Sequence, residues 1–107
     1  MEKPPTTNIA QPTLAQIRAR LAAQRADLAA RYHVREIGIF GSYVRGTQRA
    51  DSDIDMLVTF AQTPSLFTIL ALEDELAVLL GHPIDLAVRS ALRPHIGQQI
   101  LRDVVDV

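Results

Sequence analysis

The feature that most constrains this chain is a Gly-Ser pair placed directly after a short apolar run. Residues 34–40 are rich in β-branched and aromatic side chains, which predicts a buried strand, and Gly41-Ser42 follows without a break. Glycine lets a backbone turn tightly and approach a ligand, and Ser42 can cap a following helical turn. The free N–H groups at the start of such a turn bind anions. We therefore interpret the pair as a phosphate site.

Two aspartates that alternate with one isoleucine follow further along the chain. We expect a strand over residues 53–60, which places Asp53 and Asp55 on one face with their Cα atoms about 7 Å apart. Aspartate is disfavoured within strands, so a pair on one face indicates a function. Mg²⁺ prefers carboxylates together with substrate phosphates, and two ions about 4 Å apart can clamp the attacking and leaving oxygens. The two motifs together predict a site for a triphosphate and Mg²⁺.

These motifs resemble the signature of the minimal nucleotidyltransferases, a family of the DNA polymerase β-like nucleotidyltransferase superfamily. In that signature a Gly-Ser pair is followed by Asp-x-Asp on the next strand and by a third aspartate on a later strand. The third position matches Asp85 here, within the apolar run 83–86. Arg45-Gly46 matches the residues that follow the Gly-Ser pair. The resemblance covers about residues 14–104.

The resemblance implies an α+β fold, in which helices flank a small mixed β-sheet. It implies that the hydroxyl and backbone N–H of Ser42 bind the β- and γ-phosphates of ATP, and that Arg45 contacts phosphate or braces the loop. It also implies that Asp53, Asp55 and Asp85 bind two Mg²⁺ ions, with Asp85 helping to take the proton from the attacking hydroxyl. The implied reaction transfers AMP from ATP to a hydroxyl with loss of pyrophosphate.

Each of these residues also has a plainer interpretation. Ser42 could be an ordinary helix cap, Arg45 a solvated surface side chain, and the aspartates turn carboxylates that accept from backbone N–H groups. Asp51 lies in the preceding loop, where we expect it to be solvated. The three histidines show no ligand spacing, so we expect them at the surface or at helix caps and predict no zinc site.

Length, charge and composition bound the remaining possibilities. The 107 residues suffice for one domain, which we predict over residues 13–107 behind a flexible lead-in over residues 1–12. The net charge of −1 does not favour nucleic acid as the main partner. The chain has no cysteine and no apolar stretch long enough to span a membrane, so we expect a cytoplasmic protein without a membrane partner.

Hydrophobic periodicity and turn residues predict the remaining elements. A Thr13/Gln16 capping box is expected to begin the first helix. The second helix is expected to bury Leu66, Ile69, Leu76 and Leu80 and to present its acidic run, residues 73–75, to solvent. The expected elements are helices over residues 14–31, 66–80 and 92–101 and strands over residues 34–40, 53–60 and 84–88.

Two apolar features leave room for a protein partner. The valines at 104, 105 and 107 make an apolar tail, which would be unusual if it stayed free on a monomer. The first helix has an uncharged alanine sector, which either fills the surface cheaply or packs against a partner helix. That sector contains Ala15, Ala19, Ala22, Ala23, Ala26, Ala29 and Ala30.

A chain of this length leaves no room for an acceptor-binding domain, so we expect the acceptor on a partner. The resemblance points to the antitoxin of a HEPN/MNT toxin–antitoxin pair, which attaches AMP to a tyrosine hydroxyl of its HEPN ribonuclease toxin. Two alternatives stay open. One is a binding module that masks its partner by contact alone, although three mutually repelling carboxylates are costly without metal. The other is a nucleotidyltransferase that acts on a small molecule or an RNA end.

Overall fold

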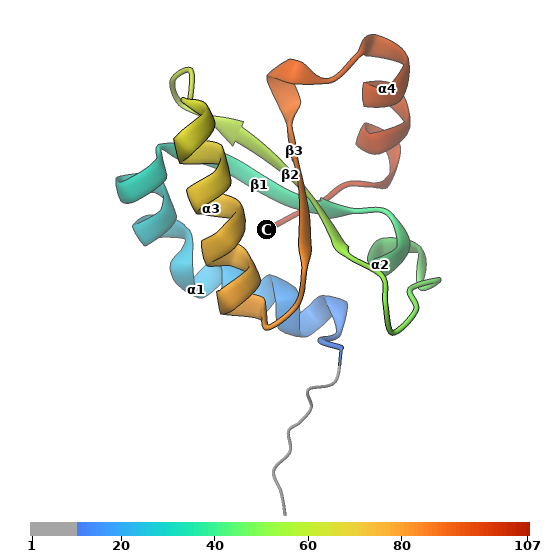
Figure 1. Ribbon diagram of the computed structural model, residues 1–107. Coiled ribbons are helices and arrows are strands. Elements are labelled where there is room, and N and C mark those ends of the chain that lie inside the picture. Colours follow the sequence, from blue (N-terminus) through green and yellow to red (C-terminus); the bar gives the residue numbers. More distant parts are fainter. Residues whose placement is uncertain (1–10) are drawn as a thin grey trace, which may run out of the picture.

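The structure is a computed structural model that describes residues 11–107 as a four-stranded sheet with helices around it (Figure 1). The strand order is β3-β2-β1-β4; β2 and β3 are parallel, and the other neighbouring strands are antiparallel. The sheet is therefore mixed, and the expected α+β fold is confirmed. In chain order the elements are α1 (Leu14–Tyr32), β1 (Val34–Phe40), α2 (Ser42–Arg45), β2 (Ile54–Phe60), α3 (Leu66–Leu80), β3 (Ile84–Val88), the 3-10 helix η2 (Arg89–Ala91), α4 (Pro94–Asp103) and β4 (Val105–Asp106).

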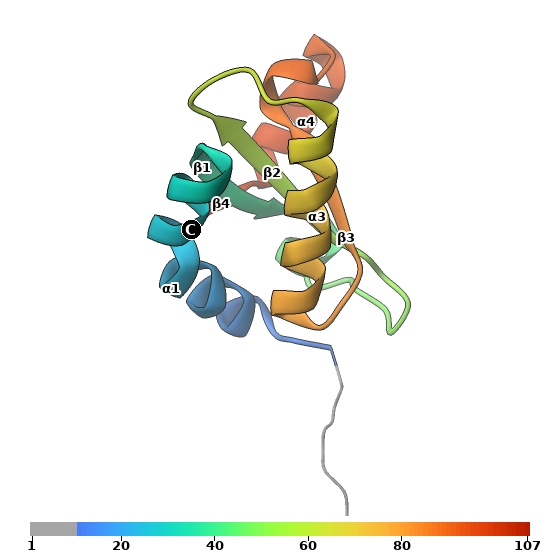
Figure 2. The same cartoon turned by 60° about the vertical axis from the view of Figure 1, so that its left-hand side comes forward.

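The helices α1 and α3 lie side by side on one face of the sheet, as Figures 1 and 2 both show. Alternate strand residues point into this layer, because successive side chains of a strand leave opposite faces. The side chains of Ile54, Met56 and Val58 are fully buried there, as are those of Leu72 and Leu76 on α3. Burial of this apolar surface is the main stabilising contribution to the fold.

The buried side of α3 differs from the predicted one in its first turn. Leu66 is 69% exposed, which makes that part of the prediction wrong, and Leu72 is fully buried instead. At 100° per residue Leu72 points within about 40° of Leu76, whereas Leu66 points about 80° away from it. The sheet therefore covers the middle and end of α3 and leaves its start open.

The acidic run of α3, predicted to be solvated, makes two contacts instead. A carboxylate oxygen of Glu73 accepts a hydrogen bond from the backbone N–H of Leu86, 3.1 Å away, on the edge strand β3. Glu75 accepts from the Tyr32 hydroxyl at 2.8 Å and from Arg31 at 2.8 Å. The hydrogen bond from Arg31, and to a lesser extent the one from Tyr32, lowers the pKa of Glu75. The run thus links α3 to the sheet edge and to α1.

The helix ends follow the expected chemistry in most cases. The capping box is confirmed, since the Gln16 N–H donates to the Thr13 hydroxyl at 3.1 Å and Gln16 accepts from the Thr13 N–H at 2.9 Å. Gly81 ends α3 in the left-handed conformation, with φ 64°. The helix α4 begins at Pro94, two residues later than predicted, because η2 precedes it and proline favours the first helical position.

His33 ends α1 in the left-handed conformation, with φ 59° and ψ 34°. A residue with a Cβ pays about 1–2 kcal/mol there, and glycine does not. We expect His33→Gly to raise the free energy of unfolding by about 0.5–1 kcal/mol, because the greater chain entropy of unfolded glycine offsets part of the gain. Urea unfolding of this variant beside His33→Ala measures the effect. Equal stability of the two variants would contradict the prediction.

The C-terminal residues complete the sheet. Val105 and Asp106 form β4, paired antiparallel with β1 opposite Ile39 and Gly38. Val107 packs against the hydrophobic core. The apolar tail is therefore covered by its own chain, and it gives no support to a partner.

The face of the sheet opposite α1 and α3 carries Phe40, Asp55 and Asp85, which are direct neighbours across the three strands β1, β2 and β3. The helix α4 packs against β1, and Val104 after it lies over Gly38. A Cβ on Gly38 would lie 2.6 Å from the Val104 side chain, so glycine is needed for this close approach. The carboxylates thus share a face with α4.

The predicted lead-in, residues 1–12, falls largely outside the described residues, since residues 1–10 are not described. Of the two that are, Pro12 is buried and Gln11 donates a side-chain hydrogen bond to the backbone carbonyl of Arg49. Each helix within residues 11–107 is too short or too polar to cross a bilayer.

Candidate active site

The Gly-Ser turn connects β1 to α2. Gly41 has φ 78° and ψ −148°, a conformation essentially restricted to glycine, and it is the N-cap residue of α2. Its carbonyl accepts hydrogen bonds from the N–H groups of Val44 and Arg45, both at 3.1 Å. Ser42 is the first helical residue, so the prediction that it caps the helix is wrong. No side chain caps α2, and the Ser42 hydroxyl is not needed to hold the turn.

Two of the predicted aspartates lie side by side on neighbouring strands. Asp55 of β2 and Asp85 of β3 are direct partners in the parallel register. Asp55 is also opposite Phe40, the residue before the Gly-Ser turn. A Cβ on Gly41 would overlap Oδ2 of Asp55, so this carboxylate lies against the turn. The turn and the carboxylate pair therefore form one site.

The third aspartate adds charge beside this pair. Asp53 directly precedes β2, which begins at Ile54 and not at Asp53 as predicted, and it is exposed. Burial raises the pKa of Asp55, and the negative charges of Asp85 and Asp53 raise it further. The positive charge of Arg45 acts in the opposite direction. Charged carboxylates so close together repel one another unless a cation binds between them.

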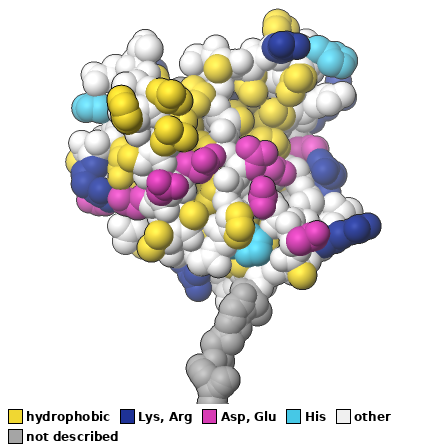
Figure 3. Space-filling model, in the orientation of Figure 1, with side chains coloured by type: hydrophobic (Ala, Val, Ile, Leu, Met, Phe, Trp, Pro, Cys, Tyr) yellow, Lys and Arg dark blue, Asp and Glu magenta, His cyan; other side chains and the backbone are white. Residues whose placement is uncertain are grey.

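The chemistry of these donors fits Mg²⁺, which binds carboxylates and leaves positions for substrate oxygens. Figure 3 shows acidic side chains gathered on the face along which β3 passes. Within residues 11–107, no three acidic or histidine side chains are gathered closely enough to make a finished metal site. The structure brings Asp55 and Asp85 together, with Asp53 at their border, and any ion bound there would need further ligands such as phosphate or water.

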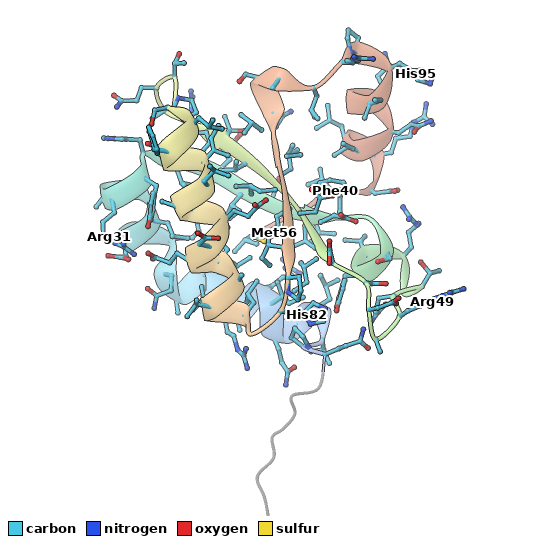
Figure 4. The ribbon with its side chains drawn as sticks, viewed as in Figure 1. Arg31, Phe40, Arg49, Met56, His82 and His95 are labelled. Carbon is cyan, nitrogen blue, oxygen red and sulfur yellow. The ribbon has the colours of Figure 1, made fainter. Side chains whose placement is uncertain are left out.

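A pocket of about 430 Å³ opens beside Asp55. This volume lies within the range of small-molecule sites, about 300–1,000 Å³. One wall contains Gly41, Arg45 and Asp55 of the predicted site, and Phe40 lies between the end of the sheet and α4 (Figure 4). The opposite wall is α4, with Gln99, Ile100, Arg102 and Asp103.

Comparison with known proteins identifies this arrangement. The family model described as "Nucleotidyltransferase domain" matches residues 21–107. This chain belongs to the nucleotidyltransferase family. It is 47% identical over 95 residues to the protein adenylyltransferase MntA of Thermococcus cleftensis, covering 89% of this chain and 96% of that protein. The resemblance to the minimal nucleotidyltransferases is thereby confirmed, and the chain is a nucleotidyltransferase.

Solved structures agree with this assignment. A structure assigned as a minimal nucleotidyltransferase matches with a TM-score of 0.76 and 34% identity, over 90% of this chain and 97% of that one. A toxin–antitoxin structure with AMP-PNP matches with a TM-score of 0.66 and 28% identity, over 78% of this chain and 69% of that one. The fold of this nucleotidyltransferase is thus the DNA polymerase β-like fold that the resemblance implied.

A histidine that sequence reasoning placed at the surface or at a helix cap links the elements around the nucleotidyltransferase site. His82 precedes β3 and lies below the sheet in Figure 4. Its Nε2 lies 2.6 Å from the backbone carbonyl of Ser52 and 3.3 Å from the hydroxyl of the buried Tyr43. A carbonyl only accepts, so Nε2 carries a proton and donates it. His82 therefore connects the loop before Asp53, the helix after Gly41 and the start of β3.

Sequence reasoning also missed the second wall of the pocket. No motif marks α4, whose polar residues look like an ordinary solvated helix end. The one available signal is the close succession of Arg102 and Asp103 in the last turn. Such a pair is common on helix surfaces and indicates no site by itself. Only the path of the chain after β3 brings α4 over Arg45.

Proposed function

We propose that this protein is a Mg²⁺-dependent adenylyltransferase that transfers AMP from ATP to a hydroxyl of a partner protein. The observation that carries the proposal is the direct pairing of Asp55 and Asp85 against the Gly-Ser turn at Gly41. Gly41 of the turn suited to phosphate, and Asp55 of the carboxylate pair suited to Mg²⁺, line one pocket. The name of the Thermococcus relative and the AMP-PNP in the toxin–antitoxin structure support ATP as the donor.

The proposed chemistry assigns a separate task to each part of the site. The Gly-Ser turn and Arg45 would bind the phosphates, and Asp53, Asp55 and Asp85, with phosphate and water as further ligands, would hold two Mg²⁺ ions. When bound, these ions supply positive charge that stabilises the transferring phosphate and the leaving pyrophosphate. The acceptor oxygen attacks the α-phosphorus, and the bond from that phosphorus to the oxygen shared with the β-phosphate breaks. The proton of the acceptor hydroxyl passes to Asp85, which is exposed.

The partner class belongs to the same proposal. By family resemblance the partner is a HEPN ribonuclease toxin, modified on a tyrosine, and this chain is the cytoplasmic antitoxin. The toxin–antitoxin structure with AMP-PNP supports such a pair. Several large apolar side chains on α3 are exposed, among them Phe67 at 86% and Val78 at 83%, which favours a protein partner over a free monomer. The alanine sector of α1 is also exposed, and its role as a partner face remains a prediction.

Incubation with ATP labelled at the α-phosphate, Mg²⁺ and extract of the source cells tests the proposal. We expect label on one protein band with the unmodified chain and none with the Asp53→Ala/Asp55→Ala double variant. The labelled band also identifies the partner. Label on RNA or a small molecule would contradict the protein acceptor. If the chain suppresses the activity of its toxin partner while no molecule becomes labelled, the result would favour a module that masks its partner by contact alone.

A further inference from the structure

An ion pair crosses the mouth of the pocket and joins its two walls. Nη1 of Arg45, on α2, lies 2.9 Å from Oδ2 of Asp103, in the last turn of α4. Both residues line the pocket, together with Gly41 and Asp55. The two side chains are 54% and 36% exposed, so the pair lies at the rim and stays in contact with solvent. An exposed pair of this kind contributes little to stability by itself.

The geometry of the pair leaves most of the arginine available. A guanidinium carries five N–H donors in a rigid fork, and Asp103 accepts from one nitrogen. Within residues 11–107, no other side chain or carbonyl accepts a hydrogen bond from the guanidinium of Arg45. The remaining donors therefore lie beside the pocket that contains Gly41 and Asp55. Fork-shaped donors of this kind suit phosphate oxygens.

An exposed arginine without an anchor samples many rotamers, and a ligand that binds it must fix one of them. Asp103 fixes Arg45 before any ligand arrives, because α4 packs against β1 and holds the carboxylate in place. The pair also cancels the negative charge that Asp103 would otherwise present to an anionic ligand. Both effects favour phosphate binding at this wall.

We propose that Asp103 is a positioning residue of the nucleotide site, which holds Arg45 at the pocket mouth with its free donors directed to the triphosphate. This inference rests on the proposed function, because it requires a nucleoside triphosphate in this pocket. It gives α4 a role in nucleotide binding that the sequence motifs do not contain. It also predicts that replacing Asp103 weakens ATP binding only while Arg45 is present. If α4 had a purely structural role, the effect of replacing Asp103 would not depend on Arg45.

Calorimetric titration of the whole chain with ATP and Mg²⁺ tests the inference. We expect Asp103→Asn to bind ATP about fivefold more weakly, which corresponds to one side chain that must be immobilised on binding. Asp103→Glu keeps the carboxylate and should recover most of the affinity. Arg45→Ala should bind more weakly still, and the Asp103→Asn/Arg45→Ala double variant should be no weaker than Arg45→Ala alone. Asp74→Asn, which removes an exposed charge from α3, should bind like the unmodified chain.

Three other results would overturn the inference. Unchanged or tighter binding by Asp103→Asn, while the unmodified chain binds ATP, would overturn the role of Asp103 alone. So would additive losses in the double variant, because they would show that Asp103 acts independently of Arg45. Absence of ATP binding by the unmodified chain would overturn the proposed function and this inference with it. Thermal unfolding of each variant confirms that the losses are measured on folded protein.

Discussion

Replacing Asp55 by asparagine is expected to reduce nucleotidyl transfer by at least about 100-fold while the protein folds normally. The loss follows because Asp55 is the partly buried carboxylate that contacts both the Gly-Ser turn and Asp85. Removing one group that stabilises charge in a transition state commonly costs about 100-fold or more. Asparagine keeps the shape of the side chain and removes the charge that would bind Mg²⁺.

Asp55→Asn is expected to lower the transfer rate without lowering the stability of the fold. The pKa of Asp55 is raised in the folded state by burial and by Asp85 and Asp53. The protonated form therefore favours folding below the unfolded pKa, and this contribution is lost as pH rises through the folded pKa. At neutral pH the charged carboxylate is a cost, so Asp55→Asn should unfold at the same or a higher temperature than the unmodified chain. Mg²⁺ should raise the unfolding temperature of the unmodified chain and not that of the variant.

Measurement of transfer rate and thermal unfolding on the same preparation checks both effects. Asp51→Asn is the matched control, because Asp51 is an exposed loop carboxylate that does not line the pocket. It should retain transfer activity and the response to Mg²⁺. Transfer by Asp55→Asn at a rate close to that of the control would remove Asp55 from the mechanism.

Gly41→Ala is expected to lower the free energy of unfolding by about 1–3 kcal/mol and to abolish ATP binding. The backbone of Gly41, at φ 78° and ψ −148°, is costly for any residue with a Cβ. That Cβ would also overlap the Asp55 carboxylate, so the turn and the carboxylate cannot both keep their positions. Denaturant unfolding and ATP titration measure the two losses separately.

Gly81→Ala separates strain from damage to the site. Gly81 also has positive φ, 64°, but a Cβ there meets no atom within 4 Å. This control should cost about 1 kcal/mol of stability and leave ATP binding intact. If Gly41→Ala bound ATP as well as Gly81→Ala does, the Gly-Ser turn would not be part of the nucleotide site.

Local chemistry explains why several elements were predictable. The strands β1 and β3 and the helix α3 have the predicted bounds, since Gly41, Gly81 and Pro83 interrupt the pattern where the backbone must turn. Asp55 and Asp85 were identifiable as candidate site residues because carboxylates interrupt apolar strands there. Asp53, by contrast, is in the loop next to the strand, since one residue of fraying shifts a boundary without changing the motif.

The features that were missed depend on contacts between distant segments. The parallel register that sets Asp55 opposite Asp85 is a property of the folded sheet. After β3 the chain returns toward β1, which brings Asp103 to Arg45 and pairs β4 with β1. No local sequence pattern indicates this return. His82 looks like a surface residue in sequence because its acceptor, the Ser52 carbonyl, lies in a loop far away in the chain.

The chemistry that we propose for this site is transfer of the nucleotidyl group of ATP. Its most direct test compares ATP labelled at the α-phosphate with ATP labelled at the γ-phosphate, in parallel reactions that contain Mg²⁺ and the partner protein. We predict that the α-label becomes attached to the partner, while the γ-label is released as pyrophosphate and never appears on protein. Attachment of the γ-label would show transfer of a phosphoryl group instead, and attachment of neither label would contradict a transferase acting on this partner.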